Sequence, residues 1–411
     1  MTSSRERVLQ SLNHQQPDRV PIDLGGHRSS GMMAIAYAKL KKHLGITTGD
    51  IYVYDIVQQL AIIEEPMLDY FGIDTIELGR GYDTSSEAWH PWVLPDGTPC
   101  QIPAFIEPIA LADGGWGIYH RDGTLIGIQK PGCLYFEQTC FPLLESQEET
   151  FADLGTPLEK VIWSAMRTPP TISGYSEASL QRLVEGARAL RARTDRAIIG
   201  LFGGNLLELG EFLFRNDSFF LLLAGEPQRA HSFLDAVVEM HLANLQKYLA
   251  AVGPYIDIIV FGDDLGMQTG PQISAKMYIE FFFPRHSLLW HTAKQLANVK
   301  VMLHLCGGVY PLLPMLIEAG LDAINPVQTT CQDMEPEKLK REFGRDLAFW
   351  GGGCNTRDVL PLGTPAEVAA DVRQRVAILA PGGGFVFQQI HNIMSDVPPA
   401  NVFAMLRAVN S

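Results

Sequence analysis

The sequence predicts an α/β fold: a (β/α)₈ TIM barrel with an N-terminal helical extension and an inserted β-meander. Eight short β-rich runs recur along the chain, and amphipathic helical stretches separate most of them. Alternating strands and helices require a parallel sheet with right-handed crossovers, and eight strands suit a closed barrel better than an open sheet. Residues 80–150 do not follow this alternation and contain two Asp-Gly turns instead.

The expected strands are short apolar runs, at 19–24, 74–78, 197–202, 257–262, 299–305, 322–327, 347–352 and 384–390. Two of the intervening amphipathic stretches cover 226–252 and 364–380. The second begins with Thr-Pro and has a Glu three residues after the Thr. This is a capping-box pattern, typical of a helix N-terminus.

The exceptional segment, 80–150, is predicted to form a β-meander inserted after the second strand. Its "LPDGTP" and "HRDGTL" stretches are Asp-Gly hairpin turns between β-rich flanks. An insertion at this place lies over the C-terminal face of a barrel, where the βα loops build active sites. We therefore expect one domain, 1–411, in which 80–150 covers the site or contacts a partner.

Composition and charge limit the classes of function. The 411 residues are 46% hydrophobic and 19% charged, which is ordinary for a globular protein with a large core. A net charge of -14 argues against binding to nucleic acid or to an anionic membrane. The six cysteines are scattered, and neither a signal sequence nor a run of about 18 apolar residues is present. We expect a soluble cytoplasmic protein that acts on a small molecule, and a homodimer is compatible with the sequence.

Polar side chains gather after the expected strands, where a barrel places its active site. From these we predict the catalytic residues Asp263, Gln328 and His391, and the substrate-binding residues His27, Arg28, Asn205, Asp264 and Asn355. Two of them have structural alternatives. Asp263 could cap the following helix, and His391 could be a buried, hydrogen-bonded histidine.

A metal site is predicted from "VMLHLCGGVY" at 301–310. His304 and Cys306 are two residues apart, so in a strand they project from the same face. Thiolate and imidazole donors favour Zn²⁺ over Mg²⁺, and zinc held for chemistry commonly takes three protein ligands. Cys354, in the glycine-rich turn after the seventh strand, is the expected third ligand. Cys331 and His391 are the alternatives.

Three further segments, "HLCGGVYPLLPMLIEAGLDAINPVQ", "FWGGGCNTRDVLPLGTPAEV" and "PGGGFVFQQIHNIMSDVPPANV", resemble the uroporphyrinogen decarboxylase superfamily. The resemblance implies a (β/α)₈ barrel with one of two chemistries. The decarboxylases use no metal and bind a tetrapyrrole with eight carboxylates through an arginine-rich N-terminal motif. The matching stretch here, "PIDLGGHRSSGMM", offers only Arg28. A porphyrin carboxy-lyase is therefore the second alternative for function.

The other branch of the superfamily contains corrinoid-dependent methyltransferases with zinc in a His-x-Cys…Cys motif, which "HLC" at 304–306 resembles. The family's last cysteine lies near the C-terminus, where this chain reads "QQIHNIMSD", so Cys354 or His391 must replace it. The resemblance implies a zinc-dependent transfer of a methyl group between a corrinoid protein and a small thiol or methylated substrate. No Asp-x-His-x-x-Gly corrinoid motif is present, so the corrinoid is expected on a separate protein. A non-catalytic ligand-binding barrel is the third alternative.

Overall fold

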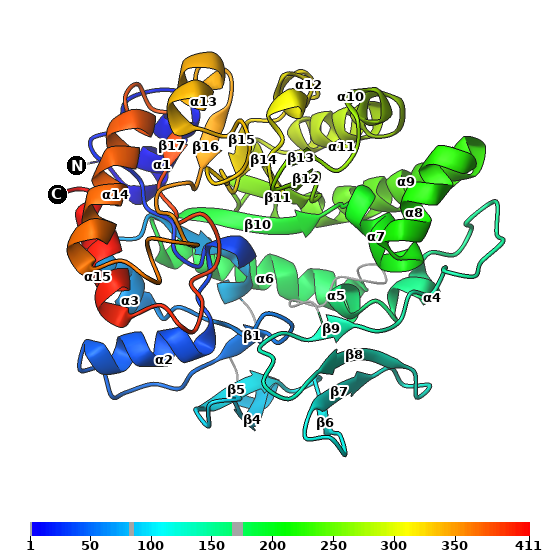
Figure 1. Ribbon diagram of the computed structural model, residues 1–411, viewed down its shortest axis with the longest axis horizontal. Helices are drawn as coiled ribbons and strands as arrows, with labels where there is room; N and C mark the ends of the chain where they lie inside the picture. Colours follow the sequence, from blue (N-terminus) through cyan, green and yellow to red (C-terminus); the bar gives the residue numbers. More distant parts are fainter. Residues whose placement is uncertain (1, 82–85, 167–175) are drawn as a thin grey trace.

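A parallel seven-stranded sheet forms the centre of the protein in the computed structural model, which describes residues 2–81, 86–166 and 176–411. Its strand order is β17-β16-β15-β14-β11-β10-β3 (Figure 1). The strands are β3 (Thr75–Glu77), β10 (Ala197–Gly203), β11 (Ile258–Gly262), β14 (Lys300–His304), β15 (Ala323–Asn325), β16 (Ala348–Trp350) and β17 (Phe385–Val386). Each lies within or beside one of the runs expected to be strands, so seven of the eight are confirmed.

The first expected strand, 19–24, joins the two edges of this sheet without forming a regular strand. Ile22 makes an isolated parallel bridge to Phe387, just after β17. On the other side, the Asp74 N–H, just before β3, donates to the Ile22 carbonyl at 2.8 Å. The segment therefore occupies the eighth position and closes the curled sheet. The predicted barrel fold is confirmed, with its first strand reduced to a bridge.

Helices surround the sheet (Figure 1). The helices that directly precede its strands are α3 (Glu65–Phe71), α6 (Glu177–Arg193), α9 (Pro227–Val252), α11 (Phe283–Leu296), α12 (Leu313–Glu318), α13 (Pro336–Phe343) and α14 (Pro365–Leu379). The others are α2 (Ala34–His43), α4 (Gly155–Leu158), α5 (Ile162–Ala165), α7 (Leu207–Phe214), α8 (Asn216–Gly225), α10 (Ala275–Met277) and α15 (Pro399–Ala408). Thr364 and Glu367 form the capping box predicted for α14. Shorter turns are η1 (Arg28–Ser30), η2 (Leu78–Gly81), η3 (Ser86–Ala88), the π-helical η4 (Tyr278–Phe282) and η5 (Tyr310–Leu312).

The N-terminal extension is α1 (Ser4–Leu12), which closes one end of the barrel. Its backbone forms hydrogen bonds with residues directly before β10 and β17. The Arg5 N–H donates to the Asp195 carbonyl, and the Gly384 N–H donates to the Ser11 carbonyl, both at 2.7 Å. Its apolar residues fill the barrel interior together with side chains of the strands, in one cluster of Val8, Leu12, Ala197, Ile199, Ile258, Val260, Met302, Ala323, Ala348, Trp350 and Val386. The opposite, C-terminal end of the barrel is not filled by α1 and is therefore available for an active site.

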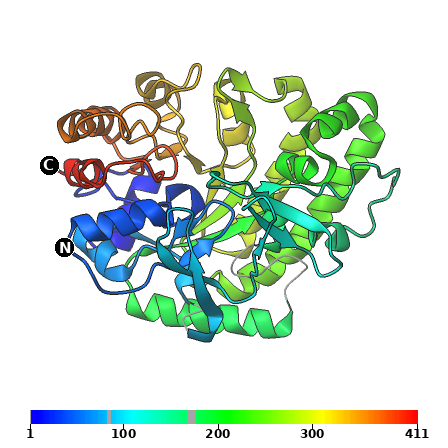
Figure 2. The ribbon, with the colours of Figure 1, turned by 60° about the horizontal axis from the view of Figure 1, so that its bottom comes forward.

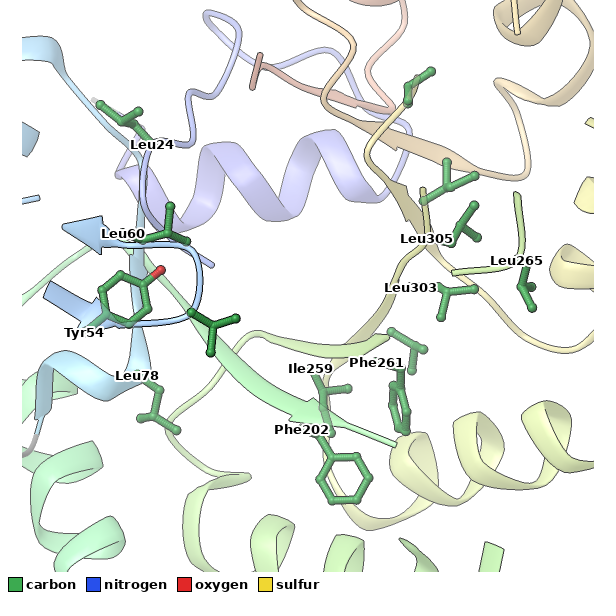
Figure 3. Packing of buried hydrophobic residues seen from close by; sticks show 14 of the residues in the cluster. Leu24, Tyr54, Leu60, Leu78, Phe202, Ile259, Phe261, Leu265, Leu303 and Leu305 are labelled. Atoms are coloured by element: carbon green, nitrogen blue, oxygen red, sulfur yellow. The ribbon is translucent and has the colours of Figure 1, made fainter. Parts of the chain in front are cut away.

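The main hydrophobic core lies outside the barrel, between the sheet and the helices. Successive side chains of a strand point to opposite faces, so Ile259 and Phe261 of β11 and Leu303 of β14 pack outward, whereas Ile258, Val260 and Met302 point inward. Figure 3 shows part of the outer core, with Leu303 and Leu305 facing Leu265 and Phe261 nearby. This packing fixes the register of the strands. The register in turn determines the direction in which the side chains at the strand ends point.

The inserted segment forms two antiparallel sheets. One contains β4 (Trp89–Val93) and β5 (Pro99–Pro103), and the other β6 (Ile109–Ala110), β7 (Trp116–Tyr119), β8 (Leu125–Gln129) and β9 (Glu137–Gln138). Hairpins therefore form at both predicted Asp-Gly turns. Two more short hairpins, β1 (Val53–Asp55) with β2 (Leu60–Ala61) and β12 (Gly266–Met267) with β13 (Gly270–Pro271), were not predicted.

The segment contacts loops at the C-terminal end of the barrel (Figure 2). The Phe136 N–H donates to the Val57 carbonyl at 3.0 Å, and the Leu143 N–H to the carbonyl of Leu213 in α7 at 2.9 Å. The Tyr135 hydroxyl donates to the sulfur of Met394, after β17, at 3.1 Å. The single-domain boundary and the role of the segment as a cover stay predictions. Within the described ranges, no helix combines the length and apolar character needed to cross a membrane.

Candidate functional site

The candidate site begins at His304, the last residue of β14. Its Nδ1 lies 3.0 Å from Oδ1 of Asn325, the last residue of β15. Its Nε2 lies 3.8 Å from the sulfur of Cys306. The side-by-side placement of this imidazole and this thiol, predicted from their spacing, is confirmed.

His391 completes a group of three metal-capable side chains. One nitrogen of each imidazole and the Cys306 sulfur all lie within 4.8 Å of one another. The His304 and His391 ring centroids are 5.8 Å apart, with the rings at 62°. Among the residues that the structure describes, no hydrogen bond to the His391 side chain is found, so its ring nitrogens remain available to a ligand.

Cys354, the expected third ligand, lies outside this group. It is fully buried, and burial, followed by the charge of Asp371 of α14, raises the pKa of its thiol. The Gly353 N–H donates to the Gln388 carbonyl and the Ile390 N–H to the Cys354 carbonyl. The glycine-rich turn is thereby held against β17 and its following segment, and its cysteine packs toward α14. The geometry groups His391, the alternative, with His304 and Cys306, and leaves Cys354 outside, so the identity of the third ligand stays a prediction in which His391 now replaces Cys354.

Two predicted site residues hold the Cys306 loop in place. The Cys306 N–H donates to Oδ1 of Asp264 at 2.6 Å, and the Gly307 N–H donates to Oε1 of Gln328 at 2.8 Å. Gly307 has φ +92°, and a Cβ there would lie 2.2 Å from the Gly266 carbonyl carbon, so the loop requires glycine at this position. Gln328, predicted to be catalytic, is positioned to orient the loop.

Asp263 is a helix cap, but the helix that it caps is α7, which precedes it in the chain, and not the following helix that the structural alternative named. It is fully buried. Its Oδ1 accepts from the N–H groups of Leu206 and Glu208, and its Oδ2 accepts from that of Leu207, at 3.0 to 3.2 Å. These donors are at the start of α7, where backbone N–H groups lack partners within the helix. In the described part of the chain, the Asp263 carboxylate makes no hydrogen bond or ion pair to the three metal-capable side chains, so we do not retain it as a catalytic residue in the proposal below.

Carboxyl groups lie near two of the three side chains, Cys306 and His304. Burial, and then the charges of Asp264 and Asp263, raise the pKa of Glu208 well above its usual value. The same causes raise the pKa of Glu211 to about 8. Burial, followed by the charges of Asp264 and Glu208, also raises the pKa of Cys306, and burial lowers that of His304. Without a cation, the site therefore favours a neutral thiol, a neutral imidazole and protonated glutamic acids.

The other predicted substrate-binding residues take varied positions. His27 is buried, with Nε2 3.1 Å from Gln388 Oε1. Asn205 donates to Glu208 Oε2 at 2.6 Å. Asn355 caps an exposed turn by accepting from the Arg357 N–H at 2.9 Å. Arg28 lies 3.3 Å from the Asp55 carboxylate, and its Nε and Nη2 have no hydrogen-bond partner in the described residues. Of these four residues, His27 is fully buried, whereas Arg28, Asn205 and Asn355 are partly exposed.

Comparison with known proteins decides the family. The model of the family described as uroporphyrinogen decarboxylase matches residues 165–411, more than half of the chain. The chain belongs to the uroporphyrinogen decarboxylase family. The matched part contains His304, Cys306 and His391, so the candidate site lies inside the family region.

Two methyltransferases of Methanosarcina mazei are similar to this family member. The methylated-thiol–coenzyme M methyltransferase is 31% identical over 150 residues, which are 36% of this chain and 36% of that protein. The chain thus matches only about a third of that relative's length. A solved structure of a methyltransferase covers 99% of this chain and 98% of its own with a TM-score of 0.57 and 16% identity. This second likeness shows that the two proteins share a fold.

Sequence reasoning missed two kinds of residue in this family member. Glu208 follows the third strand, but nothing in the sequence shows that its carboxyl is buried beside two aspartates. Asn325 and Ser29, which bond to each other beside His304, were missed because both are common in turns. The only available signal for Asn325 was its place within the predicted strand 322–327, one strand beyond that of His304.

Proposed function

We propose that this protein is a zinc-dependent methyltransferase that moves a methyl group between a corrinoid and a small thiol or methylated substrate. The observation that carries the proposal is the grouping of His304, Cys306 and His391 at the C-terminal end of the barrel, within 4.8 Å. The similarity to a methylated-thiol–coenzyme M methyltransferase supports the same chemistry. The proposed activity is that of an enzyme of the transferase class.

The donor set fits zinc. Imidazole nitrogen and thiolate sulfur are both zinc donors, and a catalytic zinc held by three protein ligands keeps a fourth position open for a substrate. The His391 side chain has no competing hydrogen bond within the ranges that the structure describes. The pKa of Cys306 is raised by burial and by nearby carboxylates, so its thiolate needs a cation beside it. Bound there, Zn²⁺ would supply Lewis acidity that holds a thiol substrate as its nucleophilic thiolate.

The chain's own residues provide proton chemistry and orientation. Glu208 is held in its neutral form by burial and by the charges of Asp264 and Asp263, so it can donate a proton to a departing sulfur, nitrogen or oxygen. The Asn205 amide donates to Glu208 Oε2 at 2.6 Å and fixes the direction of that carboxyl group. Asp264 fixes the Cys306 backbone. These contacts hold an acid beside the proposed metal ligands.

A corrinoid on a separate protein is the proposed methyl carrier. The chain lacks a corrinoid-binding motif of its own. The partner would dock over the C-terminal end of the barrel, where the inserted segment contacts the loops after β10 and β17. Arg28 is proposed to contact a polar group of the substrate, because its Nη2 has no hydrogen-bond partner in the described structure, whereas its Nε lies 3.3 Å from the Asp55 carboxylate.

The decarboxylase activity of the same family is less compatible with the charges at this end of the barrel. A substrate with eight carboxylates needs several cations. Arg28 is already beside the Asp55 carboxylate, at 3.3 Å, and Asp264, which accepts from the Cys306 N–H, adds a second carboxylate near the site. Repulsion between these groups and a polycarboxylate would oppose binding.

The test uses zinc-loaded protein, methylcobalamin as the carrier probe and coenzyme M as the thiol, followed by the loss of the methylcobalamin absorption. Methylated coenzyme M with reduced cobalamin tests the reverse direction. We expect transfer in at least one direction, which Cys306→Ser abolishes and Cys354→Ser leaves intact. Formation of coproporphyrinogen from uroporphyrinogen, with no methyl transfer in either direction, would contradict the proposal.

A further inference from the structure

Asn325 lies at the centre of a buried hydrogen-bond network beside His304. Its Nδ2 donates to the Trp350 carbonyl at 3.0 Å and to Gln388 Oε1 at 2.8 Å. A backbone carbonyl can only accept, so this contact fixes which end of the amide is the nitrogen. Both amide hydrogens are then in use, and Oδ1 faces His304 Nδ1 at 3.0 Å.

This orientation determines the tautomer of His304. Oδ1 of Asn325 has no hydrogen to give, so His304 Nδ1 must carry the hydrogen of their bond. A neutral imidazole has only one N–H, which leaves the lone pair on Nε2. That nitrogen is the one that lies 3.8 Å from the Cys306 sulfur, toward the proposed zinc ligands.

Ser29 holds Asn325 from the other side. Its hydroxyl donates to Asn325 Oδ1 at 2.6 Å and lies 3.0 Å from His27 Nδ1. His27 Nε2 is 3.3 Å from the Asp23 carboxylate, which also accepts from Trp350 Nε1 at 2.8 Å. Burial acts to raise the pKa of Asp23, but the hydrogen bond and charge of His27 and the bonds from Thr75 and Trp350 outweigh it, so the pKa is lowered.

The directions of the hydrogen bonds show whether this network only holds His304 in place or could also relay a proton. The Ser29 hydroxyl and the His304 Nδ1–H both point to the same oxygen, Asn325 Oδ1. A proton leaving His304 therefore meets an amide that is already accepting two hydrogen bonds and cannot pass a proton onward. The network restrains the imidazole in place.

We propose that Asn325 is a positioning residue that locks His304 in its Nδ1–H tautomer and so presents the Nε2 lone pair to a metal, with Ser29 and Gln388 holding Asn325 in place. The metal part of this inference rests on the proposed function. The tautomer does not depend on it, because every contact above lies within the chain. A polar partner of this kind commonly orients a metal-ligating histidine, and its loss costs about 10–100-fold in metal affinity.

The first test reads the tautomer in metal-free protein by nitrogen NMR of the imidazole side chains, with His304→Gln used to assign the signals. We expect the hydrogen on Nδ1 in the wild type and in Asn325→Asp, which keeps an acceptor oxygen. Asn325→Leu, which has similar size and no acceptor, should shift His304 toward the Nε2–H form. A wild-type spectrum with the hydrogen on Nε2 would overturn the proposal, whatever metal the protein binds.

The second test compares zinc affinity and the visible spectrum of the Co²⁺-loaded protein. Asn325→Leu should lower the affinity by about 10–100-fold and change the Co²⁺ spectrum, and Ser29→Ala should lower the affinity by less, roughly tenfold or below. Thr75→Val is the matched control, because the buried Thr75 hydroxyl bonds to Asp23 at 2.6 Å but does not contact Ser29 or Asn325. It should leave both readouts unchanged.

The outcomes separate the two proposals. Wild-type affinity in both Asn325→Leu and Ser29→Ala would overturn the positioning role while leaving the zinc site intact. If Asn325→Leu does not fold, Ser29→Ala and the wild-type tautomer decide the question. A wild-type protein that binds no zinc would contradict the proposed function, and the NMR measurement would still decide the tautomer.

Discussion

At the scale of single residues, Glu211 combines burial with the absence of a partner. Its Oε1 has no hydrogen-bond partner in the described residues, and its pKa is raised to about 8 by burial and by the charges of Asp263 and Asp264. The folded state therefore keeps this proton at a pH where the unfolded chain, with an ordinary glutamate, has lost it. Stability from this group is complete below about pH 4.5 and is lost as the pH rises through about 8.

Glu211→Gln is expected to remove this pH dependence, because an amide does not ionise. The difference in unfolding free energy between variant and wild type should shift in favour of the variant by about 1.4 kcal/mol per pH unit between pH 5 and 8. Urea unfolding at several pH values measures it. Parallel curves for the two proteins over this range would show that Glu211 titrates normally in the folded state.

At the scale of elements, the contact between the end of β11 and the start of α7 depends on one buried side chain. Asp263 follows β11, and its carboxylate caps α7 through three backbone N–H groups. Its own N–H donates to the His304 carbonyl at 2.9 Å, at the end of β14. The residue thus joins the helix that carries Glu208 to the strand that carries His304.

Asp263→Ala should therefore destabilise the protein, by about 2 kcal/mol or more, because a lost cap leaves several buried donors without a partner. The measurement is the urea-unfolding free energy at pH 7. Asp263→Asn is the matched variant, since its one remaining side-chain oxygen can satisfy part of the cap, and it should lose less. An Asp263→Ala protein of wild-type stability would contradict the capping role.

At the scale of the whole molecule, α1 fills the barrel end opposite the candidate site. Leu12 is buried among inward-facing strand residues such as Met302 and Val386. Leu12→Ala should cost about 2–5 kcal/mol of stability through the cavity it leaves. Zinc affinity in the folded variant should stay at the wild-type level, because the helix bonds to residues before the strands and the site lies after them. A large loss of zinc affinity without loss of stability would contradict this separation.

The barrel could be predicted from the sequence because its strands are apolar runs that recur at regular spacing. Hydrophobic burial determines both the apolar character of these runs and their spacing. The first strand is reduced to a bridge at Ile22, which no local pattern indicates, because closure depends on hydrogen bonds to Phe387 and Asp74 far along the chain. The pair His304 and Cys306 could be predicted because the two residues are only two positions apart at the end of β14, although Cys306 itself lies in the loop after the strand. The choice between Cys354 and His391 depends on how the turn after β16 packs on α14, which spacing does not specify.

The most direct test of the account is the zinc content and affinity of the purified protein beside three single variants. We expect about one zinc ion per wild-type chain, lost in Cys306→Ser and strongly weakened in His391→Ala. Cys354→Ser, a substitution of another buried cysteine outside the group, should bind zinc as the wild type does. A wild-type protein that stays metal-free when zinc is supplied, or a Cys354→Ser variant that loses zinc while His391→Ala retains it, would contradict the proposed site.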